Sequence, residues 1–261
     1  MPRRGARGPA PPSTAADVYP EREDTLLLVP FARGARAGST VLDLGTGGGR
    51  LALEAARAGA RVVATDRNPT AVRRLRTAAR AGGLSIEPVR TDLARGLGRF
   101  DRVLANPPYL PTRPAERDPD RWQNLALDGG ADGARVTRRI VAALPRLLAP
   151  GGRAFLLVST VQSPSALAEI RRRWRARGGR LRTVAERALV GERLAVWELA
   201  LPTRRPTVSR AGRYAPGPRR GTSVRRRSRT ARRSDSSPAP GRGRSTARGG
   251  ASARRRSPRG S

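Results

Sequence analysis

The sequence contains no cysteine, no histidine and no lysine, since every one of its 54 basic residues is arginine. Three common catalytic side chains are therefore absent. Without them the chain cannot form a thiolate nucleophile, a Ser-His-Asp triad, a Schiff base or a typical structural zinc site, and we expect no metal site. Methylation of a pyrimidine carbon through a cysteine is excluded as well. This composition favours an enzyme whose cofactor arrives already activated, so that the protein binds and orients the reactants.

Long apolar runs are also lacking. No stretch approaches the ~18 consecutive apolar residues that a membrane helix needs, and Met1 is followed by a Pro/Arg-rich stretch rather than by the apolar core of a signal peptide. The absence of cysteine excludes disulfides. These features predict a soluble, cytoplasmic protein that does not bind a membrane.

The charge is strongly one-sided, with 54 basic against 20 acidic residues and a net charge of +34. Residues 203–261 alone hold 19 arginines and one acid, Asp235, which leaves +16 for the rest of the chain. This tail predicts contact with RNA or the ribosome. Exclusive use of arginine is also what a GC-rich coding bias produces, so the charge is weak evidence about the substrate.

The pattern along the chain predicts three parts. Residues 1–17 are Pro, Arg, Gly and Ala without periodicity, and residues 203–261 are low-complexity Arg/Ser/Gly/Pro, so we expect both ends to be disordered. Residues 18–202 form the folded domain, in which β-branched or Leu-rich runs alternate with segments of helical period. We expect strands at 41–44, 61–65, 86–90, 102–105, 153–159, 180–189 and 193–201, and helices at 49–58, 69–81, 134–148 and 165–177.

This alternation predicts an α/β fold with a seven-stranded, mostly parallel sheet and helices on both faces. Only a short turn around Gly191 joins the last two predicted strands, so the last strand should run antiparallel. By analogy of topology, the arrangement resembles the Rossmann-like class I methyltransferases.

A glycine-rich turn follows the first predicted strand, in the segment VLDLGTGGGR. It places Asp43 at the strand end and then Gly45 and Gly47, which allow a sharp turn and close approach of a ligand. A tight turn of any doubly wound fold would look alike. A nicotinamide dinucleotide site would need a third glycine where this chain has Arg50.

Acidic residues also follow the next two strands. Asp66 is suited to accept both hydroxyls of an adenosyl ribose, although it could equally be the N-cap of the helix that starts near Pro69. After the third strand, Asp92 could accept from an adenine amine while Leu93 covers the ring. Taken singly, Asp92 is better explained as a helix cap or a solvated acid, and its position in the series gives it weight.

The most informative segment is Asn106-Pro107-Pro108-Tyr109, which follows the fourth strand directly. Its prolines stiffen the turn. The Asn106 amide oxygen and the Pro107 carbonyl can accept the two hydrogens of a substrate NH₂ group, and Tyr109 offers a face to a planar group. A surface turn is the alternative, but the preceding glycine turn and acids favour the catalytic interpretation.

These motifs, together with DVYPEREDTLLL, LDGGADGARVTRRI and GERLAVWEL, resemble the HemK-related glutamine methyltransferases of translation release factors, in their short archaeal and eukaryotic branch. The resemblance covers about residues 18–201 and implies S-adenosyl-L-methionine as cofactor. It places Thr25, and less directly Asp24, against the methionine end of that cofactor; a charged helix start is the alternative for Glu23 and Asp24. Other cofactor-binding residues implied are Asp43, Gly45, Gly47, Asp66, Asp92, Leu93 and Asn106; the implied catalytic residues are Asn106, Pro107 and Tyr109.

The resemblance implies N5-methylation of the glutamine in the Gly-Gly-Gln motif of a peptide chain release factor, with a small zinc-binding activator protein as partner. Bacterial members carry a helical domain before the catalytic one, whereas a short Pro/Arg stretch precedes Val18 here. Two alternatives stay open. One is methylation of an exocyclic amine of adenine or guanine in RNA or DNA, and the other is a non-catalytic RNA-binding protein.

Overall fold

A seven-stranded sheet runs through the residues described by this computed structural model, which are Val18, residues 21–117 and residues 119–202. Predictions about residues 1–17 and 203–261 lie outside that description. Within it, none of the helices has the length and apolar character needed to cross a membrane. The strands are β1 (Thr40–Leu44), β2 (Arg61–Asp66), β3 (Ile86–Arg90), β4 (Phe100–Ala105), β5 (Leu148–Ser159), β6 (Arg180–Leu189) and β7 (Glu192–Ala200).

The strand order is β3-β2-β1-β4-β5-β7-β6. All pairs from β3 to β5 are parallel, whereas β7 is antiparallel to both β5 and β6. The predicted antiparallel last strand is therefore confirmed. The order reverses between β1 and β4, and in open α/β sheets ligands bind outside the carboxyl ends of the strands at such a reversal.

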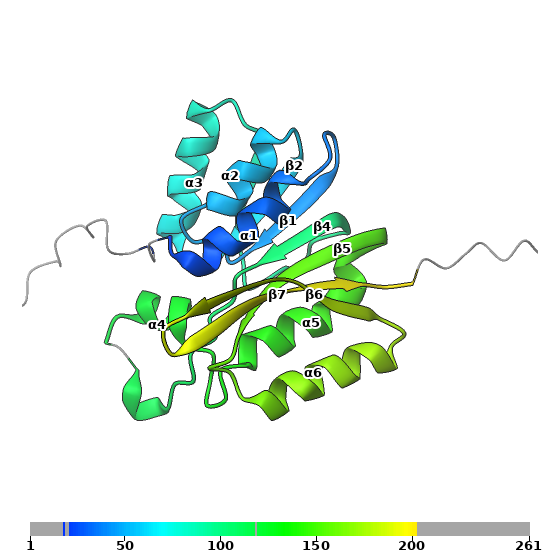
Figure 1. Cartoon of the computed structure of the whole chain (residues 1–261). Helices are drawn as coiled ribbons and strands as arrows, with labels where there is room; N and C mark the ends of the chain where they lie inside the picture. The colour runs from blue at the N-terminus through cyan, green and yellow to red at the C-terminus, as the bar shows by residue number, and fades with distance from the viewer. Residues whose placement is uncertain (1–17, 19–20, 118, 203–261) are drawn as a thin grey trace, which may run out of the picture. The chain divides into compact units, whose positions relative to one another are not determined.

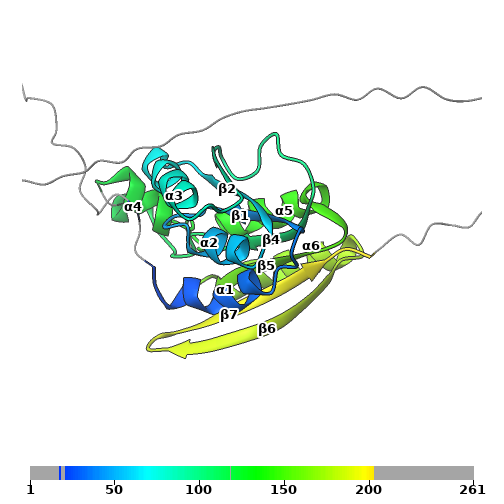
Figure 2. The same cartoon turned by 90° about the horizontal axis from the view of Figure 1, so that it is seen from above.

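Helices cover both faces of the sheet, as predicted. Figures 1 and 2 show α1, α2 and α3 gathered on one face and α5 and α6 on the other, with α4 beyond one end of the strands. The helices are α1 (Glu23–Arg33), α2 (Arg50–Arg57), α3 (Pro69–Ala81), α4 (Arg121–Leu127), α5 (Arg135–Leu147) and α6 (Pro164–Ala176), with a short 3₁₀ turn, η2, at Pro114–Glu116.

Local sequence explains where several helices begin. The Asn68 side chain accepts from the Thr70 N–H at 2.9 Å at the start of α3, and Ser163 caps α6 in the same way. Each cap is followed by a proline at the first helical position, which has no N–H to leave unsatisfied. Both starts therefore match the sequence prediction closely.

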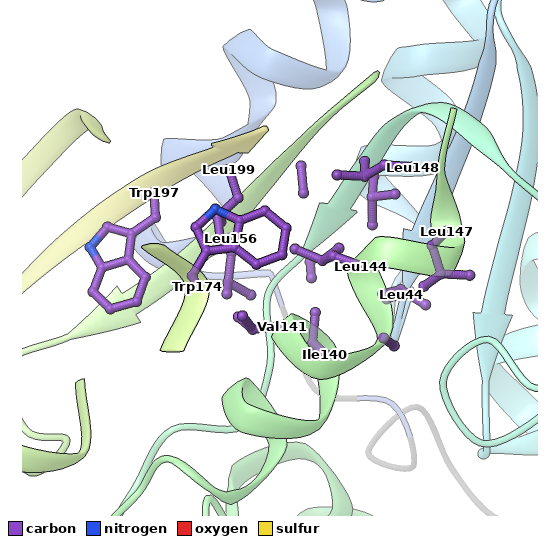
Figure 3. Close-up of a cluster of buried hydrophobic side chains, with 14 of the residues drawn as sticks. Leu44, Ile140, Val141, Leu144, Leu147, Leu148, Leu156, Trp174, Trp197 and Leu199 are labelled. Atoms are coloured by element: carbon purple, nitrogen blue, oxygen red, sulfur yellow. The ribbon is translucent and has the colours of Figure 1, made fainter. Parts of the chain in front are cut away.

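The core lies between the sheet and its two helical layers. Under α5 and α6 it contains the fully buried Trp174 and Trp197, which pack with leucines of β5 and β7 (Figure 3). Under α1 and α2 it contains Leu28, Val41 and Leu104. Because β1 is buried along most of its length, it reads as an apolar run rather than as an alternating pattern.

The sequence interpretation was incomplete at two helices. It set a charged helix start at Glu23 and Asp24 against a role beside the cofactor, but in the structure these residues begin α1 and also line the cavity described below. The interpretation placed no helix at α4 either. A seven-residue helix carries too little periodicity to be distinguished from a loop.

Candidate active site

A cavity of about 660 Å³ opens beside the carboxyl ends of β1, β2 and β4, at the reversal of strand order. Its volume is in the usual range for cofactor and ligand sites. The structure brings every predicted site residue to the wall of this one cavity, although the segments that carry them are far apart in the sequence. These residues are Thr25, Asp43, Gly45, Gly47, Asp66, Asp92, Leu93, Asn106, Pro107 and Tyr109.

The glycine turn after β1 leaves open space beside its backbone. Gly45 and Gly47 have φ values of 71° and 52°, which side chains rarely adopt, and a Cβ added at either would meet nothing within 4 Å. The Thr46 N–H donates to the Thr65 carbonyl at 2.8 Å, which ties the turn to β2. A ligand can therefore approach a fixed stretch of bare backbone.

Asp66 fastens the same turn from the end of β2. Its carboxylate accepts from the Gly47 N–H at 2.9 Å and from the Asn68 N–H at 2.8 Å. Asp66 is not the N-cap of α3, because Asn68 fills that position. Burial raises the pKa of Asp66, and the backbone hydrogen bonds oppose part of that rise. Carboxylate oxygens have further lone pairs, so Asp66 can hold the turn and still accept from a ligand.

Asp43 is almost completely buried at the end of β1, with 1% of its surface exposed. Burial raises its pKa to about 6, an effect opposed by hydrogen bonds from the Thr46 hydroxyl, at 2.7 Å, and the Ala52 backbone, while the nearby charge of Asp66 adds to it. A buried acid without a cationic partner favours its neutral form. A positively charged ligand in the cavity would favour the carboxylate instead.

Asp92 has a partner that the sequence did not indicate. Arg139 of α5 forms an ion pair with it at 2.7 Å, and both residues line the cavity. The neighbouring Leu93 has a φ of 54° and is the one non-glycine residue with positive φ in the described ranges. Such backbone strain costs of the order of 1–3 kcal/mol and is concentrated at functional sites. The turn after β3 is thus fixed by the ion pair and strained at the residue predicted to cover an adenine ring.

One polar atom of the Asn106 side chain is paired and the other is not. Its Nδ2 donates to the Thr25 hydroxyl at 3.1 Å, across 81 residues of sequence. Its Oδ1 is buried and has no hydrogen-bond partner among the described residues. Buried polar atoms are nearly always paired, because an unpaired one costs about 1–3 kcal/mol. This oxygen is therefore suited to accept a hydrogen from a group that enters the cavity.

The turn that carries Asn106 pairs with the last residue of α4 and the segment after it. The Leu110 N–H donates to the Leu127 carbonyl at 3.1 Å, and the Gly129 N–H donates to the Leu110 carbonyl at 2.8 Å. Asp128, buried between them, forms ion pairs with Arg117 and Arg135 at 3.2 Å each. The LDGGADG segment, residues 127–133, therefore holds the active-site turn in place through backbone hydrogen bonds.

Gly133 and Gln162 complete this support. Gly133 has a φ of 70°, and a Cβ added there would lie 2.4 Å from the Tyr109 carbonyl oxygen, so only glycine fits. The buried Gln162 side chain donates to the Gly133 carbonyl at 2.9 Å and to the Thr137 hydroxyl at 3.0 Å. Sequence reasoning missed Gln162, because a lone glutamine after a strand gives no signal of a contact 29 residues away.

Large apolar side chains, among them Leu110 and Trp122, line the cavity. The large hydrophobic side chains that are exposed in the described ranges are Leu26, Leu110 and Val190. Leu110 lines the cavity, and the other two follow lining residues, Thr25 and Leu189, in the sequence. Trp122 of α4 also lines it, with the Arg121 guanidinium 4.3 Å from its ring centre. Leu110 and Trp122 therefore add apolar surface to the cavity wall.

The chain is similar to several known methyltransferases. The family model described as "Methyltransferase small domain" matches residues 23–123. The mouse methyltransferase HEMK2 is 34% identical over an alignment that covers 58% of this chain and 76% of the mouse protein. The release factor glutamine methyltransferase of Deinococcus radiodurans is 42% identical over 50% of this chain, which spans about half, 49%, of that protein's length.

A solved structure shows the same likeness. The chain aligns with the Mtq2–Trm112 complex of E. cuniculi with a TM-score of 0.56 and 28% identity, over 71% of this chain and 99% of the matched one. That complex is responsible for the methylation of the eRF1 translation termination factor. The aligned region thus extends over most of the described fold.

Proposed function

Because this chain belongs to the HemK-related family of release factor glutamine methyltransferases, we propose that it transfers a methyl group from S-adenosyl-L-methionine to the side-chain amide of a glutamine. The acceptor we propose is the glutamine of the Gly-Gly-Gln motif in a peptide chain release factor. Support comes from the relatives, since the D. radiodurans protein is named for release factors and the E. cuniculi complex methylates eRF1.

The cavity walls fit a nucleoside cofactor with a positive charge. The donor side, which we define as Asp43, Gly45, Gly47, Asp66, Asp92 and Leu93, combines bare backbone with three carboxylates. We propose that Asp66 accepts from the ribose hydroxyls, that Asp92 accepts from the adenine amine and that Leu93 covers the ring. The buried Asp43 carboxylate favours a cation. When bound, the cofactor would supply an activated methyl group that needs no further catalyst to leave.

The observation that carries the proposal is the unpaired oxygen of Asn106. The acceptor side, which we define as Asn106, Pro107 and Tyr109, lines the cavity, and this buried oxygen has no partner among the described residues. A primary amide carries two hydrogens on one nitrogen. We propose that Asn106 Oδ1 accepts one of them, that the Pro107 carbonyl accepts the other and that Tyr109 contacts the plane of the amide.

Holding both hydrogens explains how a poor nucleophile reacts. The lone pair of an amide nitrogen is delocalised into its carbonyl, so the nitrogen attacks only when it is fixed in a favourable geometry. Orientation of this kind can lower a barrier by up to roughly 7–11 kcal/mol. No strong base has to act first, because the nitrogen becomes acidic once its new bond forms. The absence of histidine, cysteine and lysine is compatible with this chemistry.

The same acceptor side could hold an exocyclic amine of a nucleobase, with the base stacked on Tyr109. We favour a protein acceptor for two reasons. The D. radiodurans relative is named as a release factor methyltransferase, and the apolar side chains of Leu110 and Trp122 in the cavity wall suit a protein better than a phosphate backbone. We further propose that a small partner protein assists, as Trm112 accompanies Mtq2 in the related complex. Three expectations from the sequence stay predictions. They are that the partner binds zinc, that the protein is cytoplasmic and that residues 203–261 contact RNA.

Mass spectrometry of the acceptor tests the proposal. The full-length protein would be incubated with S-adenosyl-L-methionine and a release factor, with and without a small partner of the Trm112 type. We expect one methyl group on the Gly-Gly-Gln glutamine and none on a release factor in which that glutamine is alanine. RNA and DNA oligonucleotides serve as competing acceptors. Methylation of an oligonucleotide and not of the release factor would overturn the proposed substrate.

A further inference from the structure

The contact between Thr25 and Asn106 joins the first turn of α1 to the acceptor side of the cavity. The Asn106 Nδ2 donates to the Thr25 hydroxyl at 3.1 Å, and the opposite atom of the same amide is the unpaired Oδ1. An asparagine side chain can occupy this position in two orientations, related by a half-turn that exchanges oxygen and nitrogen. Only one of them leaves the oxygen, rather than the nitrogen, available to accept a hydrogen from a bound group.

The orientation decides whether the turn can bind its acceptor. A primary amide offers two N–H donors, so a hydrogen-bond acceptor must face it. In the reversed orientation, Asn106 would present its own NH₂ group, and two donors would oppose each other in a buried site. The reversed side chain would therefore repel the group that the site has to hold.

Thr25 alone cannot select the orientation, because a hydroxyl donates and accepts equally well. Asp24 supplies the missing asymmetry. Its Oδ1 accepts from the Thr25 backbone N–H at 2.6 Å and lies 3.4 Å from the Thr25 hydroxyl, and Asp24 is buried with 7% of its surface exposed. A carboxylate can only accept, so the hydroxyl proton points toward Asp24 and a lone pair points toward Asn106.

We propose that Thr25, oriented by Asp24, is a positioning residue that selects the productive orientation of the Asn106 amide. This inference rests on the proposed function and deepens it. It differs from the contact with the methionine end of the cofactor implied for Thr25 by the family resemblance, because it assigns the Thr25 hydroxyl a role on the acceptor side.

The decisive test compares Thr25→Val, which keeps the shape and removes the hydroxyl, with Thr25→Ser, which keeps the hydroxyl. With saturating cofactor and the release factor, we expect Thr25→Val to lower kcat roughly 10- to 100-fold and Thr25→Ser to restore most of it. Thr77→Val is the matched control, because the Thr77 hydroxyl is exposed on α3 and donates to the Arg73 carbonyl. Thermal melting would show that each variant folds.

A second background separates positioning from cofactor binding. In Asn106→Asp both side-chain oxygens are acceptors, so there is no orientation to select. Adding Thr25→Val to Asn106→Asp should therefore lower kcat far less than Thr25→Val lowers it in the wild type. An equal loss in both backgrounds would mean that Thr25 acts on the cofactor, and would overturn the inference.

A spectroscopic readout keeps the inference testable even if the release factor is the wrong acceptor. In ¹⁵N-labelled protein, the Asn106 side-chain NH₂ signals can be assigned because Asn106→Asp removes them. We expect slow solvent exchange of these hydrogens in the wild type and in Thr25→Ser, and fast exchange in Thr25→Val. Unchanged Asn106 signals in Thr25→Val would refute the positioning role, whereas failure of release factor methylation alone would refute only the proposed substrate.

Discussion

The donor side and the acceptor side of the cavity draw on different parts of the chain. On the donor side, the glycine turn is held by the hydrogen bond from the Gly47 N–H to Asp66, 19 residues away, while the turn after β3 forms an ion pair with Arg139, 47 residues from Asp92. On the acceptor side, the Asn106 turn is held by Thr25, 81 residues before it, and by Gly133, which Gln162 holds in turn. The donor side lies at the ends of three neighbouring strands and takes one contact from α5, whereas the acceptor side is assembled only when α1 and the loop after β5 have packed.

This difference predicts where mutations act. Changes on the donor side should alter cofactor affinity and leave the acceptor turn intact. Changes on the acceptor side should alter the rate of transfer with little effect on cofactor affinity, including changes at residues that touch no substrate.

The largest effect is expected from Asn106→Ala. It removes the proposed acceptor of the amide hydrogen, and loss of one such preorganised group typically costs a hundred- to a thousandfold in kcat. Cofactor affinity should change much less, and Asn106→Asp should retain partial activity because it keeps an acceptor oxygen. Steady-state kinetics on the release factor and calorimetry with the cofactor measure both. Near wild-type turnover by Asn106→Ala would mean that the Asn-Pro-Pro-Tyr segment is a structural turn without a catalytic role.

Gly133→Ala should have the next largest effect, although Gly133 contacts no substrate. Its Cβ would lie 2.4 Å from the Tyr109 carbonyl oxygen, so the active-site turn must shift, and a displacement of about 1 Å can cost roughly a hundredfold in rate. Gly38→Ala is the matched control, since Gly38 has a similar φ of 76° and its added Cβ meets nothing within 4 Å. Equal losses of kcat in both variants would show that backbone strain, and not support of the turn, is responsible.

Asp66→Ala should weaken cofactor binding by about 1.5–3 kcal/mol, or roughly 10- to 100-fold, through loss of charge-assisted hydrogen bonds. The variant also removes the hydrogen bond that the Gly47 N–H donates to the Asp66 carboxylate at 2.9 Å. Calorimetry gives the affinity, and kcat at saturating cofactor should change less than it does in Gly133→Ala. Unchanged cofactor affinity would mean that Asp66 holds the glycine turn but does not bind the cofactor.

Asp43 should make cofactor affinity depend on pH. Its folded pKa of about 6 lies above the ordinary value of 3.8, so Asp43 becomes neutral as the pH falls through 6 and attracts a cation less. Affinity should therefore decrease below about pH 6 in the wild type and vary less in Asp43→Asn, as calorimetry across pH 5–8 would show.

The same shift has a consequence for stability. A raised carboxyl pKa in the folded state favours folding at low pH, and this contribution is lost as the pH rises from about 4 to 6, by about 3 kcal/mol for the separation between 3.8 and 6. Denaturant unfolding should therefore show Asp43→Asn gaining stability relative to the wild type across that window. A constant difference between the two proteins would contradict the assigned pKa.

The smallest effect is expected from ending the chain at residue 204. Both sides of the cavity are formed by residues before 202, and the apolar periodicity of the sequence does not continue beyond residue 201. Transfer to a peptide-sized acceptor should stay unchanged, whereas any RNA binding, measured over a range of salt, should decrease. A loss of cooperative melting would show that the boundary of the domain lies further on.

The sequence by itself predicted most of the fold and the donor side. Regular alternation of apolar strands with helical segments located six of the seven strands to within two residues; β5 begins at Leu148, five residues before the predicted start, where the sequence predicted the end of a helix. The acids and glycines could be identified because each lies at the end of a strand or in the turn after it, and parallel strands bring their carboxyl ends to one edge of the sheet. The Asn-Pro-Pro-Tyr turn was predictable for the same reason.

Tertiary structure alone decided the rest. The Leu-rich start of α1 and its internal Pro30 give no clear helical period, so a helix there forms because packing against α2 and the sheet compensates for weak local preference. Arg139 and Gln162 are single polar residues whose partners lie 47 and 29 residues away. The proposed orientation of the Asn106 amide depends on Thr25, which reaches Asn106 only in the folded chain, because hydrogen bonds between distant segments are fixed by packing and not by local sequence.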